Sequence, residues 1–314
     1  MISAIVVNYN GAEFLSACLE SLCTQTYPDL EVIVVDNDST DGSGRIPVEF
    51  ESCVHLIRSP TNLGYGGGIN AGIAEASGDL IFALNNDIVL DCFCVEYLAR
   101  AVEEDPRIGM CSPKMLLPDG RLNTTGLCIS RSGAAWDHNF GRENIDLNDQ
   151  AEELLGPSGG AALYRKEMLE QVGSFDESFF MYMEDVDLAV RARLAGWKYR
   201  YVPEAVVLHA HGATAGRGSD LALYYSNRNI LWYTVKDFPL LLLITSLPWI
   251  IGRNIGVVFY YLLKGRGRLI FLAKVHAVAG LGRMLRERKS VIRSVPSHDF
   301  SRFVRTWAEE EARL

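Results

Sequence analysis

Basic residues are scarce in the first three quarters of this chain of 314 residues. Residues Met1–Asp237 contain 17 Lys and Arg but 34 Asp and Glu. A body so poor in positive charge argues against nucleic-acid binding, because clusters of Lys and Arg hold the phosphate backbone. The composition, with 48% hydrophobic and 22% charged residues, excludes intrinsic disorder, collagen and coiled coil.

Cysteines at metal-binding or redox spacing are also absent. The seven cysteines form no Cys-x-x-Cys pair, and their odd number in a long chain does not indicate a disulfide framework. We therefore expect reduced, mostly buried thiols and a cytosolic protein. No basic segment precedes the first apolar run, so no signal peptide is expected, and we find no internal repeat.

Short β-branched runs alternate with helical patterns in the first half of the chain. Strands are expected over Ser3–Val7, Glu31–Val35, Val54–Ile57 and Leu80–Leu84, and a helix with one apolar face over Glu13–Gln25. Strands that are apolar on both faces and separated by single helices predict a parallel sheet covered on both sides.

Polar side chains follow three of these strands directly. The triplets are Asn8-Tyr9-Asn10, Asp36-Asn37-Asp38 and Asn85-Asn86-Asp87. Because ligands of such sheets bind at the carboxyl ends of the strands, we expect these residues to cluster at one ligand-binding edge. Asp36 alone is equally well explained as a helix N-cap.

Asp87 offers a hard oxygen ligand of the kind that Mg²⁺ or Mn²⁺ uses when it bridges phosphates. His209 and His211 follow an expected strand and could add a nitrogen ligand. Without the nearby carboxylates, a hydrogen-bonded histidine pair at a strand end would be the better explanation.

The second half of the chain is less regular. Residues Pro118–Leu155 form a long excursion rich in Gly, Asn and Asp. Helices are then expected over Arg165–Val172 and Asp185–Ala195, and two short strands over Tyr199–Val202 and Ala205–Leu208.

Three carboxylates, Glu184, Asp185 and Asp187, lie within four positions at the start of the second of these helices. Acidic residues there favour the helix dipole whatever else they do. The preceding run, Phe179–Met183, is wholly apolar, which is an unusual way to begin a surface helix. A general base partly desolvated by aromatic residues explains the pattern better.

The C-terminal tail combines apolar and basic residues. Phe238–Leu263 has 18 apolar residues out of 26, but Arg253 lies within it, and Pro248 and Gly252 are expected to interrupt a helix. Phe238–Arg305 contains 12 basic and 2 acidic residues. We expect broken helices lying on the anionic inner leaflet of a membrane. A helical pair packed on the domain, or a homodimer interface, is the alternative.

Several motifs, taken in order, resemble glycosyltransferase family 2. They are VVNYNG, VIVVDNDSTDGS, NLGYGGGINAGI, LNNDIVL, the run from GSFDESFFMYMEDVDLAV to VVLHAHGAT, and YYSNRN. They cover Ile2 to about Asn229 and are most similar to the branch containing rhamnosyltransferases of surface-polysaccharide synthesis. The Gln-x-x-Arg-Trp motif of processive synthases is absent, so the resemblance implies one sugar per encounter.

The resemblance implies a GT-A fold, an α/β architecture with a Rossmann-like, mostly parallel sheet and helices on both faces. Residues 1–237 would form the catalytic domain, with a nucleotide-sugar half (1–117) and an acceptor half (118–237). Residues 238–314 would add the C-terminal apolar and basic helices.

The resemblance also implies roles for individual residues. Asp185, paired with Glu184, matches the catalytic base of an inverting transfer, and Asp87 and His209 match the ligands of Mg²⁺ or Mn²⁺. Asn85-Asn86-Asp87 keeps only the last acid of the family's Asp-x-Asp motif. The implied partners are a nucleotide-sugar donor, dTDP-L-rhamnose first, and a saccharide acceptor that is lipid-linked at the inner leaflet. Donor contacts are expected from Asn8, Asn10, Asp36, Asn70, Asn85, Asn86, Gly159 and Gly160.

Three other functions compete with this one. Gly66-x-Gly68-x-x-Ala71 matches a loose dinucleotide fingerprint and would suggest an NAD-dependent oxidoreductase, but it does not follow the first strand. A non-catalytic, membrane-docked scaffold would be expected to lack the Glu-Asp pair or the late histidine. A nucleotidyltransferase would carry several basic residues near the first Gly-rich loop, where only Arg58 is found.

Overall fold

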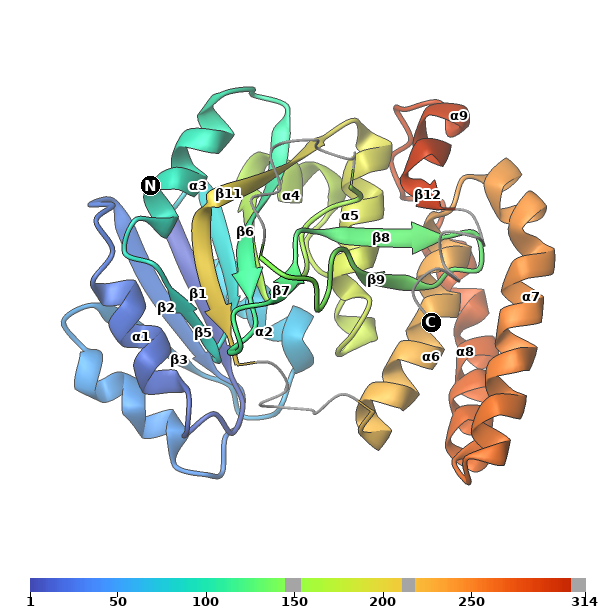
Figure 1. Cartoon of the computed structure of the whole chain (residues 1–314), viewed down its shortest axis with the longest axis horizontal. Helices are drawn as coiled ribbons and strands as arrows, with labels where there is room; N and C mark the ends of the chain where they lie inside the picture. The colour runs from blue at the N-terminus through green and yellow to red at the C-terminus, as the bar shows by residue number, and fades with distance from the viewer. Residues whose placement is uncertain (145–153, 211–217, 306–314) are drawn as a thin grey trace.

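The computed structural model describes residues 1–144, 154–210 and 218–305 and is built around one large sheet (Figure 1). The strand order is β3-β2-β1-β4-β10-β6-β11-β5, with β7 paired to β6. The strands are β1 (Ile2–Asn8), β2 (Leu30–Asp36), β3 (Val54–Arg58), β4 (Leu80–Asn85), β5 (Ile88–Leu90), β6 (Ile108–Leu116), β7 (Leu122–Thr124), β10 (Ala161–Arg165) and β11 (Lys198–His209).

The four strands β3, β2, β1 and β4 are parallel, as the sequence predicts. In this register Asn8 is paired with Asp36, so the polar residues after β1 and β2 lie side by side. The sheet continues through β10, which is antiparallel to both β4 and β6. The parallel part thus brings its polar strand ends to one edge, as expected.

Helices cover both faces of the sheet. On one face, α1 (Leu15–Cys23) and α3 (Cys94–Glu103) pack on the apolar side chains of one core. On the other face, α2 (Gly64–Glu75), α4 (Lys166–Val172) and α5 (Glu184–Ala195) share a second core. Because successive side chains of a strand point to opposite faces, the uninterrupted apolar strands supply both cores.

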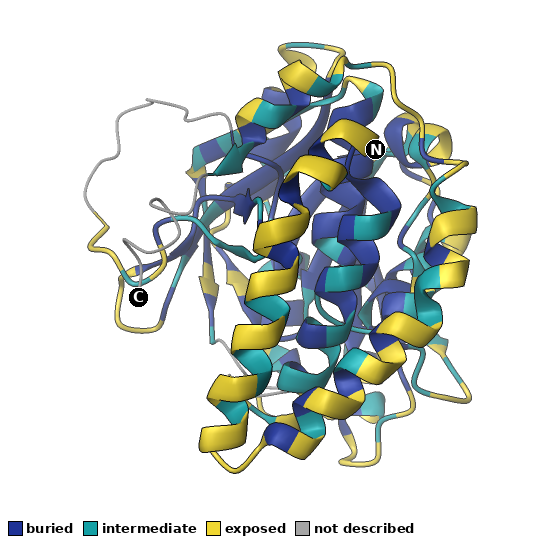
Figure 2. Cartoon of the chain, turned by 90° about the vertical axis from the view of Figure 1, so that its right-hand side faces the viewer, coloured by how far each residue is buried: buried dark blue, intermediate teal, exposed yellow. Residues whose placement is uncertain are grey.

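A helical layer lies beyond α5 (Figure 1). It contains α6 (Asp220–Asp237), α7 (Leu240–Leu263) and α8 (Gly267–Glu287), and the Trp232 indole of α6 donates to the Ala277 carbonyl of α8 at 2.9 Å. Figure 2 shows that the outward faces of the outer helices are exposed. Smaller elements are the sheet of β12 (Val304–Arg305), β8 (Leu127–Ser130) and β9 (Ala135–Asp137), the helix α9 (Ser297–Phe300) and the 3₁₀ turns η1 (Ser43–Phe50), η2 (Glu177–Phe179) and η3 (Ser301–Phe303).

Two expected interruptions by proline are wrong. The two short strands expected around Pro203 are one strand, β11, which passes the proline with a register irregularity between Val202 and Val206. The tail helix expected to break at Pro248 and Gly252 is the continuous helix α7, with Pro248 inside it. In both cases neighbouring elements hold the backbone through a residue that lacks a hydrogen-bond donor.

The expectation that all cysteines are reduced is also wrong in the structure. Cys23, at the end of α1, forms a disulfide with Cys53, just before β3, across 30 residues of sequence. The fold brings the two positions to a Cα–Cα distance of 6.1 Å, which spacing along the chain does not reveal. The other five cysteines are not part of this disulfide, and all but Cys92 are buried.

The glycines of α2 let this helix lie directly against β1. A Cβ on Gly68 would come within 2.8 Å of Val7 Cγ1, and one on Gly72 within 2.4 Å of Ile5 Cγ2. These glycines therefore serve helix–sheet packing, because no side chain fits between the two backbones.

We predict that Gly72→Ala lowers stability by about 1–3 kcal/mol, since the added methyl group forces β1 and α2 apart. Thermal or urea unfolding measures the change. Gly256→Ala in α7 is the matched control, because its Cβ would meet nothing within 4 Å. The control should be neutral or stabilising by up to about 1 kcal/mol. Equal stability of the two variants would contradict the packing role.

Candidate active site

A chain of polar side chains links three strand ends at the expected edge. The Asn8 amide donates to Asp36 Oδ1 at 3.0 Å, and the Asn86 amide donates to Asn8 Oδ1 at 2.9 Å. Asn8 Nδ2 also donates to Ser43 Oγ at 2.9 Å. The ends of β1, β2 and β4 are thereby fixed relative to one another.

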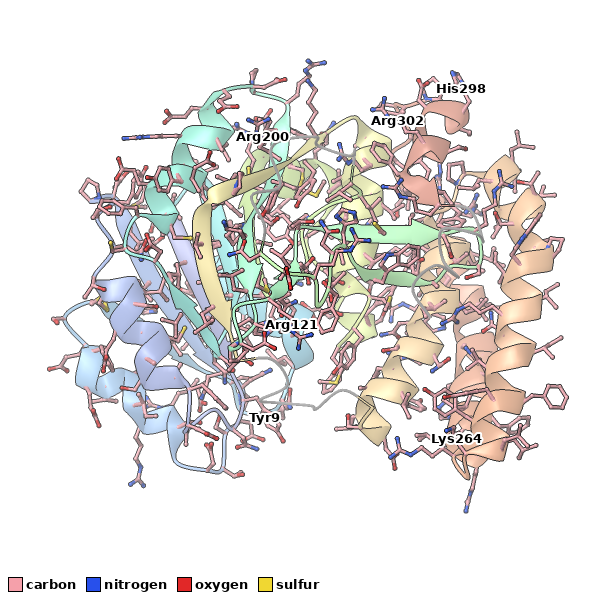
Figure 3. The ribbon with its side chains drawn as sticks, viewed as in Figure 1. Tyr9, Arg121, Arg200, Lys264, His298 and Arg302 are labelled. Carbon is pink, nitrogen blue, oxygen red and sulfur yellow. A yellow bond between two sulfur atoms is a disulfide. The ribbon has the colours of Figure 1, made fainter. Side chains whose placement is uncertain are left out.

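A cavity of about 340 Å³ opens beside this chain of contacts. Its lining brings together eight of the predicted site residues, which come from distant parts of the sequence, and Tyr9, labelled in Figure 3, lies at the same end of the sheet. Asn8 and Asp36 are buried behind the lining and support it. The predicted residues in the lining are Asn85, Asn86, Asp87, Gly159, Gly160 and His209, together with Glu184 and Asp185.

Asp87 and His209 meet in this cavity, with Nε2 of the histidine 3.3 Å from Oδ1 of the aspartate. His209 Nδ1 lies 2.8 Å from Asn123 Oδ1, and an amide oxygen can only accept, so Nδ1 carries the proton and Nε2 presents a lone pair. Among the described residues, the buried Asp87 Oδ1 accepts no hydrogen bond. Two electron-pair donors facing each other in a cavity fit a divalent cation.

These two residues do not form a complete protein cage for a metal. No group of three or more His, Cys, Asp or Glu that could hold a metal is found in the parts of the chain that the structure describes. A cation held here would take its remaining ligands from a bound diphosphate and from water, which is how Mg²⁺ commonly binds in phosphate sites. His211 lies outside the described residues.

Asp185 occupies the opposite wall of the cavity with a fixed carboxylate. Its Oδ2 accepts a hydrogen bond from the Gly159 amide at 2.8 Å, and its Oδ1 accepts one from the Val186 amide at 2.8 Å. Burial raises the pKa of Asp185 to about 6, although the Gly159 hydrogen bond acts in the other direction. Burial also raises the pKa of the neighbouring Glu184 to about 8, and the charge of Asp185 adds to this.

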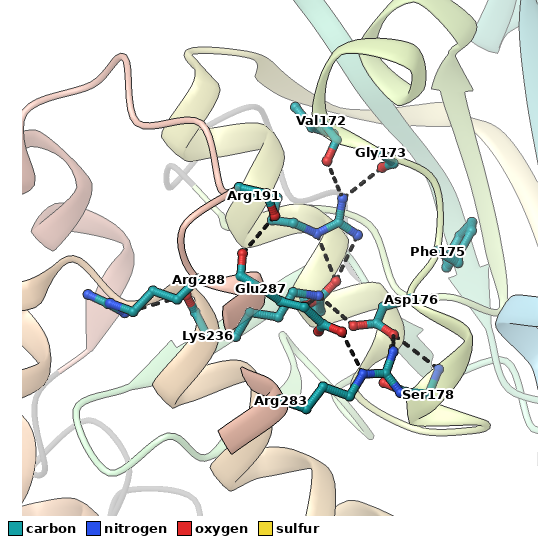
Figure 4. Close-up of polar contacts among 12 residues, drawn as sticks. Val172, Gly173, Phe175, Asp176, Ser178, Arg191, Lys236, Arg283, Glu287 and Arg288 are labelled. Atoms are coloured by element: carbon teal, nitrogen blue, oxygen red, sulfur yellow. Dashed lines mark hydrogen bonds and ion pairs between the residues drawn. The ribbon is translucent and has the colours of Figure 1, made fainter. Parts of the chain in front are cut away.

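The third acid of the group, Asp187, is fully buried and does not line the cavity. It belongs to an ion-pair network whose members Arg191, Lys236 and Asp176 are seen in Figure 4. Arg191 and Lys236 each approach its carboxylate to 2.7 Å. Burial opposes ionisation of Asp187, but the two cations outweigh it, and the pKa is lowered. Arg191 also donates to the carbonyls of Val172 and Gly173 at 2.8 and 2.7 Å. The network thus ties α5 to α4 and α6.

Besides Asn8 and Asp36, two more of the predicted donor-binding residues lie outside the cavity lining. Asn10 is exposed, and its side-chain oxygen accepts a hydrogen bond from the Thr40 amide at 2.8 Å. Asn70 holds the loop after α4, because its Nδ2 donates to the Phe175 carbonyl at 2.8 Å and its Oδ1 accepts from the Phe175 amide at 3.1 Å. Contacts from these two residues to a nucleotide stay a prediction.

Gly159 and Gly160 lie on the cavity wall, where little room exists for a side chain. A Cβ on Gly159 would be 3.3 Å from Asp185 Oδ2, and one on Gly160 would be 3.1 Å from the Met115 methyl group. Tyr65 from α2 donates its hydroxyl hydrogen bond to the Gly159 carbonyl. The glycines therefore allow a close approach of backbone to Asp185.

Asn37, from one of the polar triplets expected at this edge, is also in the lining. The lining further contains residues that the sequence did not single out: Asn62, Tyr65, Trp136, Asp137 and Met181–Met183. Asn37 donates to Asn62 Oδ1 at 3.1 Å and so joins the end of β2 to the start of α2. Trp136 and Asp137 come from β9 in the Gly-rich excursion, where no sequence pattern marked them.

The fold and the site together define a glycosyltransferase of the GT-A type. A mannosyltransferase from Pyrobaculum calidifontis, solved with GDP-mannose and Mn²⁺, is similar with a TM-score of 0.55, 18% identity, and coverage of 92% of this chain and 84% of that one. The structure of GalNAc-T7 with UDP, GalNAc and Mn²⁺ gives a TM-score of 0.60 at 16% identity, covering 76% of this chain and 49% of that one. At these identities the likeness shows the fold, as the sequence predicts.

The sequence comparison then gives the family. Residues 3–173 match the description "Glycosyl transferase family 2". The N-acetylglucosaminyl-diphospho-decaprenol L-rhamnosyltransferase of Mycobacterium tuberculosis is 32% identical over 257 residues, which are 73% of this chain and 83% of that protein. The chain belongs to glycosyltransferase family 2. The two structural neighbours named above were solved with Mn²⁺, which is consistent with a divalent metal in this fold.

Membership of glycosyltransferase family 2 argues against the alternative of an NAD-dependent oxidoreductase. The glycines of the loose dinucleotide fingerprint are in α2, where Gly68 packs against Val7 and Gly66 against Phe175. Neither serves the strand-to-helix turn that cradles a pyrophosphate in dinucleotide-binding folds.

We predict that Glu184→Gln stabilises the protein at pH 8 but not at pH 4.5. The pKa of Glu184 is raised in the folded state, so folding favours the protonated form. The unfavourable contribution is therefore absent below the unfolded pKa and grows as pH rises towards 8. The gain at pH 8 should be on the order of 1–3 kcal/mol. Glu75→Gln, at an exposed position of α2, is the control in thermal unfolding. A gain that is equal at both pH values would contradict the burial argument.

Proposed function

We propose that this chain is an inverting, non-processive sugar transferase, with dTDP-L-rhamnose as donor and a hydroxyl group of a lipid-linked saccharide as acceptor. The observation that carries the proposal is one cavity of about 340 Å³ lined by Asp185, Asp87 and His209. The mycobacterial relative supports the choice of donor and acceptor, since its name gives L-rhamnose as the sugar and a diphospho-decaprenol lipid as the carrier.

Asp185 is the general base. With a pKa of about 6 it is mostly ionised at pH 7, whereas Glu184, with a pKa of about 8, stays mostly protonated. The Asp185 carboxylate takes the proton of the acceptor hydroxyl as that oxygen bonds to the anomeric carbon. The bond from that carbon to the diphosphate breaks, and the nucleoside diphosphate leaves with the electron pair.

Asp87 and His209 would hold the divalent metal, Mg²⁺ or Mn²⁺, whose charge neutralises the diphosphate as it departs. Asn123 keeps the His209 ring in the tautomer that offers Nε2. Asn85 and Asn86 line the same part of the cavity and present amide groups to a bound donor.

Asp185→Asn should lower kcat by about 10²–10⁴-fold, because the amide cannot accept the proton, while the donor affinity stays nearly unchanged. Initial rates of transfer and donor binding by calorimetry measure the two quantities. In the wild type, kcat should fall about tenfold per pH unit below pH 6, since the base is then protonated. A variant that retains wild-type turnover would remove Asp185 from the base role.

The donor is tested by thermal stabilisation with a panel of nucleotide sugars, each with and without Mg²⁺ or Mn²⁺. A bound donor at about 100 times its Kd adds roughly 2.7 kcal/mol, which raises Tm by several degrees. We expect the largest shift with dTDP-L-rhamnose and metal, and we expect His209→Ala to remove the metal-dependent part. A shift with NAD alone, or one independent of metal, would contradict the assignment.

We further propose that α7 and α8 rest on the inner leaflet of a membrane. Among the described residues, one helix is long enough and apolar enough to span a bilayer by length and composition, and this helix is α7. Apart from Thr245 and Tyr260, its exposed side chains are apolar along its whole length, and Lys264, Arg266 and Arg268 are exposed at the turn to α8. Helices α8 and α6 cover one side of α7. If α7 lies on the membrane surface, the apolar side chains on its uncovered side are buried in lipid rather than exposed to water. The exposed apolar residues include Leu240, Leu241, Ile244, Ile251, Ile255, Phe259, Leu263, Phe271 and Val278.

Co-sedimentation with anionic and neutral vesicles across a salt series tests this surface. Binding should weaken as salt rises without vanishing, because salt screens the basic residues but not the apolar burial. A triple variant, Ile251→Ser, Ile255→Ser and Phe259→Ser, should lose most binding, whereas Val48→Ser, exposed on η1, should bind normally. A full-length protein that ignores both vesicle types and sediments as a dimer would make this face an interface between two copies.

A further inference from the structure

The loop that leads into α5 has an unusual backbone. Three of its residues, none of them glycine, have positive φ: Phe180 at 65°, Tyr182 at 64° and Met183 at 72°. Residues with a side chain rarely adopt this backbone, because the Cβ crowds the following carbonyl oxygen. A conformation of this kind persists only where the surrounding structure holds it.

The side chain of Asn229, from α6, forms hydrogen bonds with the backbone of this loop. This side chain is fully buried, and its Nδ2 lies 2.9 Å from the Phe179 carbonyl oxygen, 2.9 Å from that of Met181 and 2.7 Å from that of Tyr182. The amide group of one side chain thus forms hydrogen bonds with three carbonyl oxygens of the five-residue loop 179–183. These contacts require the loop carbonyls to converge, which an extended or helical loop does not allow.

Two further donors complete the set. Arg228 Nη2 donates to the carbonyls of Ser178 and Phe179, each at 2.9 Å, and the Tyr65 amide donates to the Phe180 carbonyl at 2.8 Å. Every carbonyl from residue 178 to residue 182 therefore accepts a hydrogen bond from α6 or α2. Each successive carbonyl of the loop is thus fixed by a donor from a neighbouring helix.

The position of this loop determines where the candidate base lies. Met183 is the N-cap of α5, with no side-chain cap, and Glu184 and Asp185 follow it directly. The loop residues Met181–Met183 themselves line the cavity. We propose that Asn229 is a positioning residue that holds the loop of residues 179–183, with positive φ at Phe180, Tyr182 and Met183, in the conformation that places Asp185 at the cavity. This inference rests on the proposed function of Asp185.

The neighbouring Asn227 shows what an ordinary buried asparagine does on the same helix. Its Nδ2 donates to the Leu223 carbonyl at 2.9 Å, one turn back in α6. Its backbone carbonyl oxygen accepts a hydrogen bond from the Lys274 ammonium at 2.7 Å. None of these contacts reaches the loop. Asn227→Ala keeps the backbone contact with Lys274 and is a matched control for Asn229→Ala.

The test compares the two alanine variants in transfer kinetics and hydrogen exchange. Asn229→Ala should lower kcat by about 10- to 100-fold with the donor KM changed by less than about threefold, since a misplaced base slows the transfer without weakening donor binding. Amides of residues 179–187 should exchange at least about tenfold faster. Asn227→Ala should leave kcat and that exchange within about twofold of the wild type.

A double-mutant cycle with Met183→Gly tests the backbone argument. Glycine adopts a φ of 72° without penalty, so the clamp matters less in that background. The kcat loss caused by Asn229→Ala should shrink by about 3- to 10-fold when residue 183 is glycine. If the two substitutions act independently, Asn229 does not hold the left-handed backbone and the proposal is wrong.

Two outcomes overturn the clamp directly: unchanged kcat in folded Asn229→Ala, or unchanged exchange of residues 179–187. If Asn229→Ala does not purify as folded protein, the half-buried Arg228→Gln removes two of the loop contacts and should show the same pattern at about 3- to 10-fold in kcat. A wild type that transfers no sugar would refute the proposed function instead, and hydrogen exchange would still decide whether Asn229 clamps the loop.

Discussion

The position of α5, which carries Asp185, depends on the ion pairs of the buried Asp187 carboxylate. This carboxylate is fully buried and is neutralised by Arg191 from its own helix and by Lys236 from α6. Removing one member of such a buried pair leaves an uncompensated charge and commonly costs about 3–5 kcal/mol. Because Lys236 also pairs with Asp176 at 2.7 Å, the same contact fixes the loop after α4. The first turn of α5, and with it Asp185, is held in place from behind.

The sequence identifies this group of acids but cannot divide the work among them. Glu184, Asp185 and Asp187 lie within one helical turn and look alike in a sequence. Their surroundings separate them: burial raises the pKa of the first two, whereas Arg191 and Lys236 lower that of the third. The partner Lys236 is 49 positions away, so no local pattern reveals it. A charge becomes structural or chemical only through partners that the fold supplies.

The parallel half of the fold follows from the sequence because its signals are local. Four β-branched runs with polar ends predict β1 to β4 and the edge where Asn8, Asp36 and Asn86 meet. The errors have non-local causes. The Cys23–Cys53 disulfide depends on the packing of α1 against η1, which ends just before Cys53, and α7 continues through Pro248 while it packs along α8. Asn70, chosen for its place in a Gly-rich motif, holds the Phe175 backbone, and its contact with a donor stays a prediction.

Helix α6 makes contacts with the cavity loop at Asn229 and with α8 at Trp232, less than one turn further along. Because less than one helical turn separates these two contacts, α7 and α8 can move little relative to the cavity. On the proposed membrane surface, this link would hold the cavity at a constant height above the bilayer. Acceptors would then be selected by the distance of their hydroxyl group from that surface, in addition to their chemical identity.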